Sequence, residues 1–98
     1  VLRALKLVTA AIISNRQTPN AEASMVKVWA SELRQRLDGV AMDLLGRYGA
    51  LSRESGDIAP AAGAFDAGYR GSPVGRFGGG TNEVQRNIIA QRGMHLPR

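Results

Sequence analysis

Cysteine is absent from the 98-residue sequence, and histidine occurs once, as His95. Without thiols no disulfide framework can form, and neither can a zinc or redox site built on thiolates. A single histidine near the end of the sequence cannot supply a histidine-based metal cluster. We therefore expect no metal site, and the lack of disulfides is typical of a cytoplasmic protein.

Long hydrophobic runs are also absent. The apolar stretch over residues 1–13 is interrupted by Arg3 and Lys6, and it lacks the small-residue cleavage site of a signal peptide. A bilayer-spanning helix needs about 20 consecutive, predominantly apolar residues. We expect no membrane partner.

The usual catalytic residue sets are missing as well. The serines lack the surroundings of a nucleophile elbow, and no two carboxylates are patterned as a general acid–base pair. The residues by themselves therefore predict a helical module rather than an enzyme.

The charge is modestly positive, +5, from 13 basic and 8 acidic residues. A positive field attracts nucleic acids and other polyanions. The basic residues, however, are spread from Arg3 to Arg98 without a block, and the few aromatic residues form no stacking platform. We expect a solvated basic surface and no nucleic-acid partner, with a small basic nucleic-acid binder kept as the third hypothesis.

What the sequence does contain is helical periodicity. Apolar residues recur three or four positions apart, which predicts one helix over about residues 1–15 and another over about 20–45. The positions are Val1, Ala4, Leu5, Val8, Ala11 and Ile12 in the first, and Val26, Trp29, Leu33, Leu37, Val40 and Leu44 in the second. Pro19 suits the first turn of the second helix, with Thr18 or Asn20 as the N-cap.

Residues of about 50–80 are rich in glycine and proline and show little periodicity, which predicts a long loop, followed by a short helix over about 81–91. A loop approaching thirty residues is uncommon in a self-sufficient domain, so we expect it to lie against another subunit, domain or ligand. Phe65 and Tyr69 are its expected anchors. A core this small predicts stability only within an assembly.

A run of three glycines, Gly78 to Gly80, leads directly into Thr81. Glycine lets the backbone approach a ligand closely, and Thr81 is expected to cap the helix that follows. The unpaired N–H groups at a helix start favour a phosphate or another anion. A plain linker is the other interpretation, and the residues alone leave both open.

Residues 77–98, FGGGTNEVQRNIIAQRGMHLPR, resemble the C-terminal end of the acyl-CoA dehydrogenase family. Residues 41–49, AMDLLGRYG, resemble a family segment that usually ends in Gln-x-x-Gly-Gly-x-Gly, with Asp43 replacing Gln and Arg47 replacing the second Gly. The resemblance covers essentially the whole chain. It implies an all-α fold, as part of the family's C-terminal four-helix-bundle domain: two long helices, a long Gly-rich loop and a short C-terminal helix.

Family members are flavoproteins that remove a proton from the α-carbon of an acyl-CoA thioester. They pass hydride from the β-carbon to FAD, and the electrons leave to an electron-transfer flavoprotein. The resemblance therefore implies the C-terminal FAD-binding and oligomerisation segment of such an enzyme, inactive as this piece alone. The implied assembly is a homo- or hetero-oligomer, either a dimer or a tetramer.

The resemblance also implies site residues. Contacts with the FAD ribose and pyrophosphate fall on Thr81, Asn82 and Glu83, and contacts with FAD held mainly by a neighbouring subunit fall on Asp43, Gly46 and Arg47. Gly79 and Gly80 would leave room beside the flavin for the substrate thioester or a bulky acyl group.

Many family members carry the catalytic base as a Glu immediately before the Gly-Thr of this motif, where this sequence has Gly79. Glycine cannot abstract a proton, so we expect no catalytic residue here. Some subfamilies place the Glu on an earlier helix, upstream of Val1. In others one subunit of a heteromeric pair carries no base, and the alternative hypothesis is therefore a non-catalytic partner subunit or helical interaction module. The GGGTNE form and the final LPR also resemble actinobacterial members, including those that act in fatty acid or steroid side-chain β-oxidation.

Overall fold

The computed structural model describes residues 1–97, in two compact units. Unit 1 comprises Val1–Ala30 and Arg76–Arg98, of which Arg98 lies outside the described residues, and unit 2 comprises Ser31–Gly75. All of the regular secondary structure in residues 1–97 is helical, which confirms the all-α prediction. Within the same residues, no helix combines the length and apolarity that a membrane span requires.

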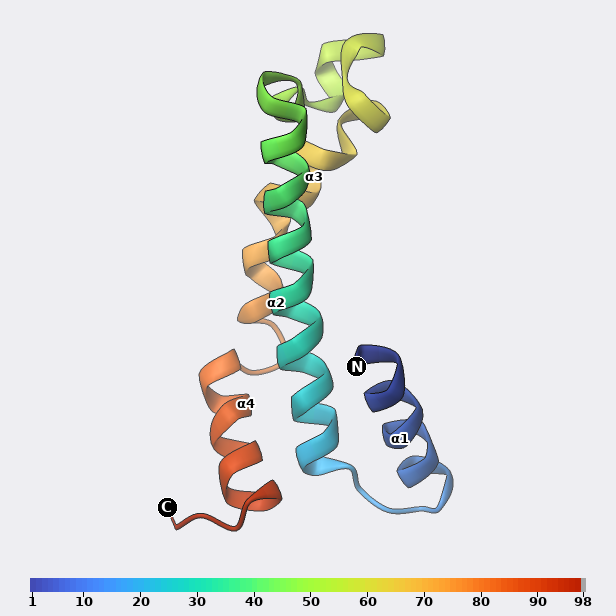
Figure 1. Cartoon of the computed structure of the whole chain (residues 1–98), viewed down its shortest axis with the longest axis vertical. Helices are drawn as coiled ribbons and strands as arrows, with labels where there is room; N and C mark the ends of the chain where they lie inside the picture. Colours follow the sequence, from blue (N-terminus) through green and yellow to red (C-terminus); the bar gives the residue numbers. More distant parts are fainter. Residues whose placement is uncertain (98) are drawn as a thin grey trace. The chain divides into compact units, whose positions relative to one another are not determined.

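Unit 1 contains the two ends of the chain (Figure 1). Its elements are α1 (Leu2–Ser14), the first part of α2 (Asn20–Leu45), α4 (Asn82–Ile88) and the π-helical turn η5 (Ile89–Gly93). The end of η5 lies close against the start of α2, because a Cβ added to Gly93 would stand 3.2 Å from the Cβ of Ala21. This contact brings the C-terminal helix back onto the helix that begins at residue 20.

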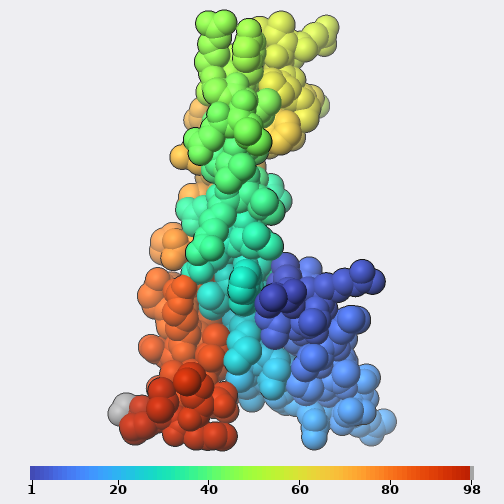
Figure 2. All heavy atoms as spheres, viewed as in Figure 1, coloured from blue at the N-terminus to red at the C-terminus, as the bar shows by residue number. Residues whose placement is uncertain are grey.

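Helix α1 has no buried residue, although its sequence is strongly apolar. Leu7, Val8 and Ile13 are all exposed, and Figure 2 shows the side chains of this helix, in blue, open at the surface. An amphipathic helix contributes to stability mainly by burying its apolar face. The exposed face of α1 therefore agrees with the expectation that the chain is stable only within an assembly.

Unit 2 contains the remainder of α2 and a series of short helices. They are η1 (Gly46–Ala50), η2 (Arg53–Ile58), η3 (Pro60–Gly63), α3 (Ala64–Gly71) and η4 (Ser72–Arg76), whose last residue belongs to unit 1. The prediction of a loop over about 50–80 is wrong for most of that range. Glycine and proline mark the joints between short helical turns: Gly56 and Gly63 adopt positive φ, and Pro60 opens η3.

Burial of large side chains is slight throughout the described residues. Their buried hydrophobic residues are Ala21 and Ala59, whereas Trp29, Leu44 and Phe77 are exposed. The expected anchors Phe65 and Tyr69 also remain partly open, at 37% and 48% exposure. Polar contacts and close backbone approaches therefore define the positions of many segments.

Candidate cofactor-binding segment

Residues 77–81, called here the glycine segment, connect η4 to α4. Gly79 and Gly80 have φ values of 68° and 91°, a region that residues with a Cβ rarely adopt. The Nε2 of Gln85 donates a 3.0 Å hydrogen bond to the Gly79 carbonyl. A Cβ on Gly80 would lie 2.8 Å from this same nitrogen. The segment thus turns tightly around the Gln85 amide and leaves both glycines exposed.

Thr81 is the N-cap of α4, as the sequence predicts. Its backbone is extended, with φ −62° and ψ 157°, and its Oγ1 accepts a 3.3 Å hydrogen bond from the Val84 N–H. Helix α4 continues without a break into η5. The cap therefore fixes where the helical run begins relative to the exposed glycines.

Glu83 lies in the first turn of α4 and is exposed. The pKa of its carboxyl group is lowered, chiefly by a hydrogen bond from its own backbone N–H. The Thr81 side chain and the charges of Arg76 and Arg86 add to this effect. The carboxylate is thus the favoured form beside two cationic side chains.

Lys27 lies on α2 and hydrogen-bonds the two residues that flank the glycine segment. Its Nζ donates to the backbone carbonyl of Arg76 at 2.9 Å and to Oδ1 of Asn82 at 2.7 Å. These two hydrogen bonds are called here the Lys27 bridge. Lys27 is half-buried, and Asn82 is completely buried, at 0% exposure. One ammonium group therefore holds the residues that flank positions 77–81.

The Lys27 bridge joins a residue that the sequence did not single out to one that it did. The half-buried side chain of Lys27 bonds to oxygens of its own chain. Asn82, for which the resemblance implies a contact with FAD, is buried in this chain, and its Oδ1 accepts from Lys27. The sequence held one indication that the Lys27 side chain is partly buried, since Lys27 stands between Val26 and Val28 and next to the apolar stripe.

The second predicted group, Asp43, Gly46 and Arg47, lies in unit 2 at the end of α2 and the start of η1. All three residues are exposed. The guanidinium carbon of Arg47 stands 5.3 Å from the centroid of the Tyr48 ring, a cation–π distance. This group therefore presents a charged, solvent-facing surface, and unit 2 by itself does not enclose it.

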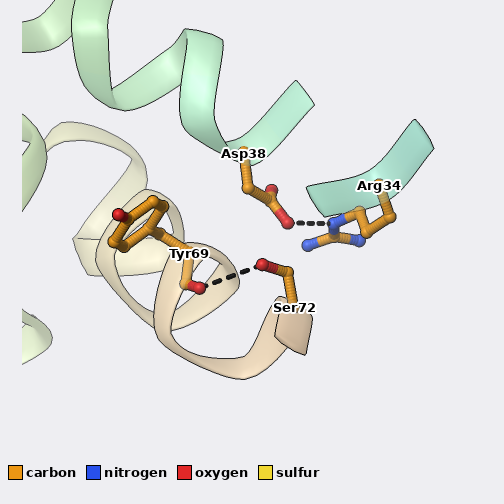
Figure 3. A network of polar contacts seen from close by, with 4 residues as sticks. All are labelled: Arg34, Asp38, Tyr69 and Ser72. Carbon is orange, nitrogen blue, oxygen red and sulfur yellow. Dashed lines mark hydrogen bonds and ion pairs between the residues drawn. The ribbon is translucent and has the colours of Figure 1, made fainter. Parts of the chain in front are cut away.

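Unit 2 also contains a cavity of about 290 Å³ between α2 and α3. The residues that line it are Ser31, Arg34, Ala67, Gly68, Gly71, Ser72 and Gly75. Beside it, Figure 3 shows Arg34 paired with Asp38 at 2.7 Å, and the Ser72 hydroxyl donating to the Tyr69 carbonyl at 3.0 Å. Arg34 is the only charged residue of the lining, and no cluster of metal-ligating side chains occurs within residues 1–97.

The family model described as "Acyl-CoA dehydrogenase, C-terminal domain" matches residues 1–94. The chain belongs to this family. The match includes the glycine segment, the Lys27 bridge and the end of α2, so all the predicted site residues fall inside the acyl-CoA dehydrogenase domain.

Two relatives from Mycobacterium tuberculosis are similar over most of this domain. The chain is 35% identical over 100 residues to "Acyl-CoA dehydrogenase FadE26", covering 96% of the chain and 25% of the relative. It is 37% identical over 78 residues to "Acyl-CoA dehydrogenase FadE29", covering 80% of the chain and 20% of the relative. The chain thus spans about a quarter of the length of these dehydrogenases or less.

Two solved structures share the fold. One is the crystal structure of the ChsE4–ChsE5 complex from Mycobacterium tuberculosis, with a TM-score of 0.82 and 36% identity, covering 98% of this chain and 25% of that chain. The other is a variant of the Tcur3481–Tcur3483 steroid ACAD, with a TM-score of 0.88 and 29% identity, covering 99% of this chain and 25% of that chain. The first is described as a complex, and the description of each structure pairs two names.

Proposed function

We propose that this chain is the C-terminal FAD-binding and oligomerisation segment of a flavin-dependent acyl-CoA dehydrogenase. The complete enzyme would remove the α-proton of an acyl-CoA thioester and transfer hydride from the β-carbon to FAD. It would pass electrons to an electron-transfer flavoprotein in the cytoplasm. The observation that carries this proposal is the family match over residues 1–94, with an ordered, exposed glycine segment at the predicted cofactor motif.

The residues around the glycine segment suit a diphosphate. Gly79 and Gly80 present backbone without side chains, and a Cβ at Gly80 would occupy the place of the Gln85 amide. Three cationic side chains lie around this segment. Lys27 bonds the residues that flank it, and the charges of Arg76 and Arg86 act on Glu83 in the first turn of α4. Close backbone approach together with positive charge is what phosphate binding requires. Bound FAD would supply the hydride acceptor.

Thr81 and Glu83 would make the direct FAD contacts of this chain, with Gly79 and Gly80 leaving space for the substrate. Asp43, Gly46 and Arg47 would meet FAD held mainly by a neighbouring subunit. Their exposure within unit 2 supports this assignment, because a residue that serves a partner's site must be open in its own chain. The isolated 98-residue piece would be inactive.

For the substrate we propose the acyl-CoA thioester of a steroid side chain. One solved relative is described as a steroid ACAD, the other is a complex, and the description of each pairs two names. Two successive glycines beside the flavin would suit a bulky acyl group better than larger side chains would. A heteromeric assembly would also cover the exposed apolar face of α1.

The test uses the complete protein, co-expressed with its partner subunit where one is encoded beside it. We expect it to be purified with a visible flavin spectrum that bleaches when a steroid side-chain acyl-CoA is added. Straight-chain acyl-CoA thioesters serve as the comparison substrates. Purification without flavin, together with no FAD binding on reconstitution, would overturn the proposal. Bleaching by straight-chain substrates alone would support the proposed dehydrogenase activity and contradict the proposed steroid substrate.

Gly79 supports a second candidate, the non-catalytic partner subunit of a heteromeric enzyme. Glycine supplies no proton acceptor at the position where many relatives carry one. The two candidates differ in the location of the base. If changing each upstream Glu of this protein to Gln leaves dehydrogenation intact while a Glu change in the partner abolishes it, the partner-subunit role is the correct one.

A further inference from the structure

We infer that Lys27 is a positioning residue for cofactor binding: its ammonium group holds the glycine segment in the conformation that receives FAD. This inference rests on the proposed function. Lys27 itself need not touch the cofactor, because its hydrogen bonds run to Arg76 and Asn82, the two residues that flank the segment. The juxtaposition of a half-buried lysine, a backbone carbonyl and a fully buried amide carries the inference.

The connectivity of the Lys27 bridge makes it a constraint on the whole segment. Arg76 and Asn82 enclose residues 77–81, and a single nitrogen on α2 binds both. Fixing both ends of a short glycine-rich stretch removes much of the backbone entropy that glycine otherwise has. Binding then costs less free energy, because the segment is already ordered.

The charge of Lys27 adds a second contribution. Both acceptors in the Lys27 bridge are neutral oxygens, a peptide carbonyl and an amide, so neither cancels the positive charge of the ammonium. A partly buried cation held this way favours a nearby anion, because charge interactions strengthen away from bulk water. The diphosphate of FAD supplies such an anion at the segment that Lys27 holds.

Gln85 makes a further hydrogen bond to the glycine segment. Its Nε2 donates to the carbonyl of Gly79, which lies between the two ends that Lys27 binds. Gln85 belongs to α4 itself, however, so its contact is local, whereas Lys27 reaches across from α2. Lys27 therefore ties the residues that flank the segment to α2 within unit 1.

The experiment measures FAD affinity in the complete, assembled protein after flavin removal, by titration with FAD. Lys27→Met keeps the length of the side chain and removes the ammonium. We expect the Kd for FAD to rise about tenfold, the typical effect of losing a hydrogen bond to a charged group. Lys6→Met is the matched control, because Lys6 is exposed on α1, and it should leave the Kd unchanged.

Amide hydrogen exchange on the FAD-free protein separates positioning from general stability. In Lys27→Met, exchange should rise over residues 77–82 and stay unchanged in unit 2. Exchange that rises throughout both units would assign Lys27 an ordinary structural role and overturn the inference. Lys27→Arg keeps the charge and should recover part of the affinity lost in Lys27→Met.

Outcomes for this inference and for the proposed function are distinguishable. If the unmodified protein binds no FAD, the proposed function itself fails. If the unmodified protein binds FAD and Lys27→Met binds equally well, the Lys27 inference fails and the proposed function stands. Should Lys27→Met not assemble, Lys27→Arg decides: we expect a Kd about threefold higher than that of the unmodified protein, the effect of one impaired hydrogen bond, and an unchanged Kd would overturn the inference.

Discussion

In unit 1 the Lys27 bridge joins residues 49 and 55 positions apart, whereas in unit 2 the ion pairs Arg34–Asp38 and Arg70–Asp66 each join residues four positions apart. The short-range pairs lie on the surface of single helices, and their arginines are largely exposed, so they add little to the stability of those helices. The long-range bridge determines where a glycine-rich segment lies. In unit 2 the comparable constraint is the close approach of Gly63 to the backbone of Ser52 and Arg53.

The largest effect is expected at Gly63, where unit 2 depends on backbone contact. A Cβ at this position would stand 2.3 Å from the Arg53 nitrogen and 2.6 Å from the Ser52 carbonyl carbon, and φ is +77°. Backbone atoms cannot move aside as a flexible side chain can. We expect Gly63→Ala to lower the free energy of unfolding by about 3 kcal/mol or more, measured by denaturant titration of the complete protein.

Gly39→Ala is the control for Gly63→Ala. Gly39 lies inside α2, and a Cβ there would meet nothing within 4 Å in the chain. Alanine is favoured over glycine in a helix interior, so we expect this variant to gain about 0.5–1 kcal/mol. Equal losses in both variants would contradict the role assigned to the Gly63 contact. A loss at Gly39 alone would place a partner chain against this face of α2.

In unit 1 the corresponding pair is Gly80 and Gly79. Both have positive φ, but a Cβ at Gly80 would meet the Gln85 amide at 2.8 Å, and a Cβ at Gly79 would meet nothing within 4 Å. We expect Gly79→Ala to cost about 1 kcal/mol from backbone strain alone. Gly80→Ala should cost about 2 kcal/mol, because the Gln85 hydrogen bond to Gly79 is also disturbed.

Thermal unfolding of the two variants measures this difference. Because the obstacle at Gly80 is the far end of a side chain, Gly80→Ala should still be milder than Gly63→Ala. Gln85→Ala in the Gly80→Ala background serves as the control, since it removes the obstacle. If the double variant is no more stable than the sum of the two single changes predicts, the steric account of Gly80 is incorrect.

Much of the helical framework follows from local sequence, and the site follows only in part. Apolar spacing predicted helices over about 1–15 and 20–45, where the structure has α1 and α2. The Gly-Thr sequence predicted the Thr81 cap, since capping depends on residues within one turn. The short helices of unit 2 were missed because each spans four to eight residues, too few for an apolar repeat to develop.

Lys27 and Asn82 illustrate why the remainder of the site was not predictable. Nothing within one helical turn of Lys27 indicates that its partners lie at Arg76 and Asn82, because the pairing is set by the fold. The motif that includes Asn82 drew attention to cofactor contact, yet burial decides which side chains of a motif face a ligand. The motif therefore marked the segment, whereas the burial of Asn82 beside it follows only from the fold.

A smaller effect is expected where unit 2 relies on a surface ion pair. Asp38→Asn removes the carboxylate that accepts from Arg34 Nε at 2.7 Å, but the Arg34 side chain is 61% exposed. We expect a loss of about 0.5 kcal/mol or less, falling further in high salt. Denaturant titrations at low and high salt measure it. A loss comparable with that of Gly63→Ala would mean that the pair supports the cavity between α2 and α3.

The smallest effect is expected at Glu83, and it depends on pH. The pKa of this carboxyl group in the folded protein lies below its ordinary value of 4.5, chiefly because of the hydrogen bond from its own N–H. A lowered pKa contributes stability that is complete above pH 4.5 and is lost as the pH falls through the folded-state pKa. Glu83→Gln should therefore be less stable than the unmodified protein at neutral pH.

The measurement for Glu83 is thermal unfolding of both proteins from neutral to acidic pH. The difference between them should narrow as the pH falls below 4.5, because the unmodified Glu83 then becomes neutral as well. The exposure of Glu83 keeps the difference small, since water screens the charges of Arg76 and Arg86. A difference that stays constant or widens toward acid pH would show that Glu83 acts by shape alone. The positive charge of Lys27, Arg76 and Arg86 near the start of α4 would then be unaffected by the ionisation of Glu83.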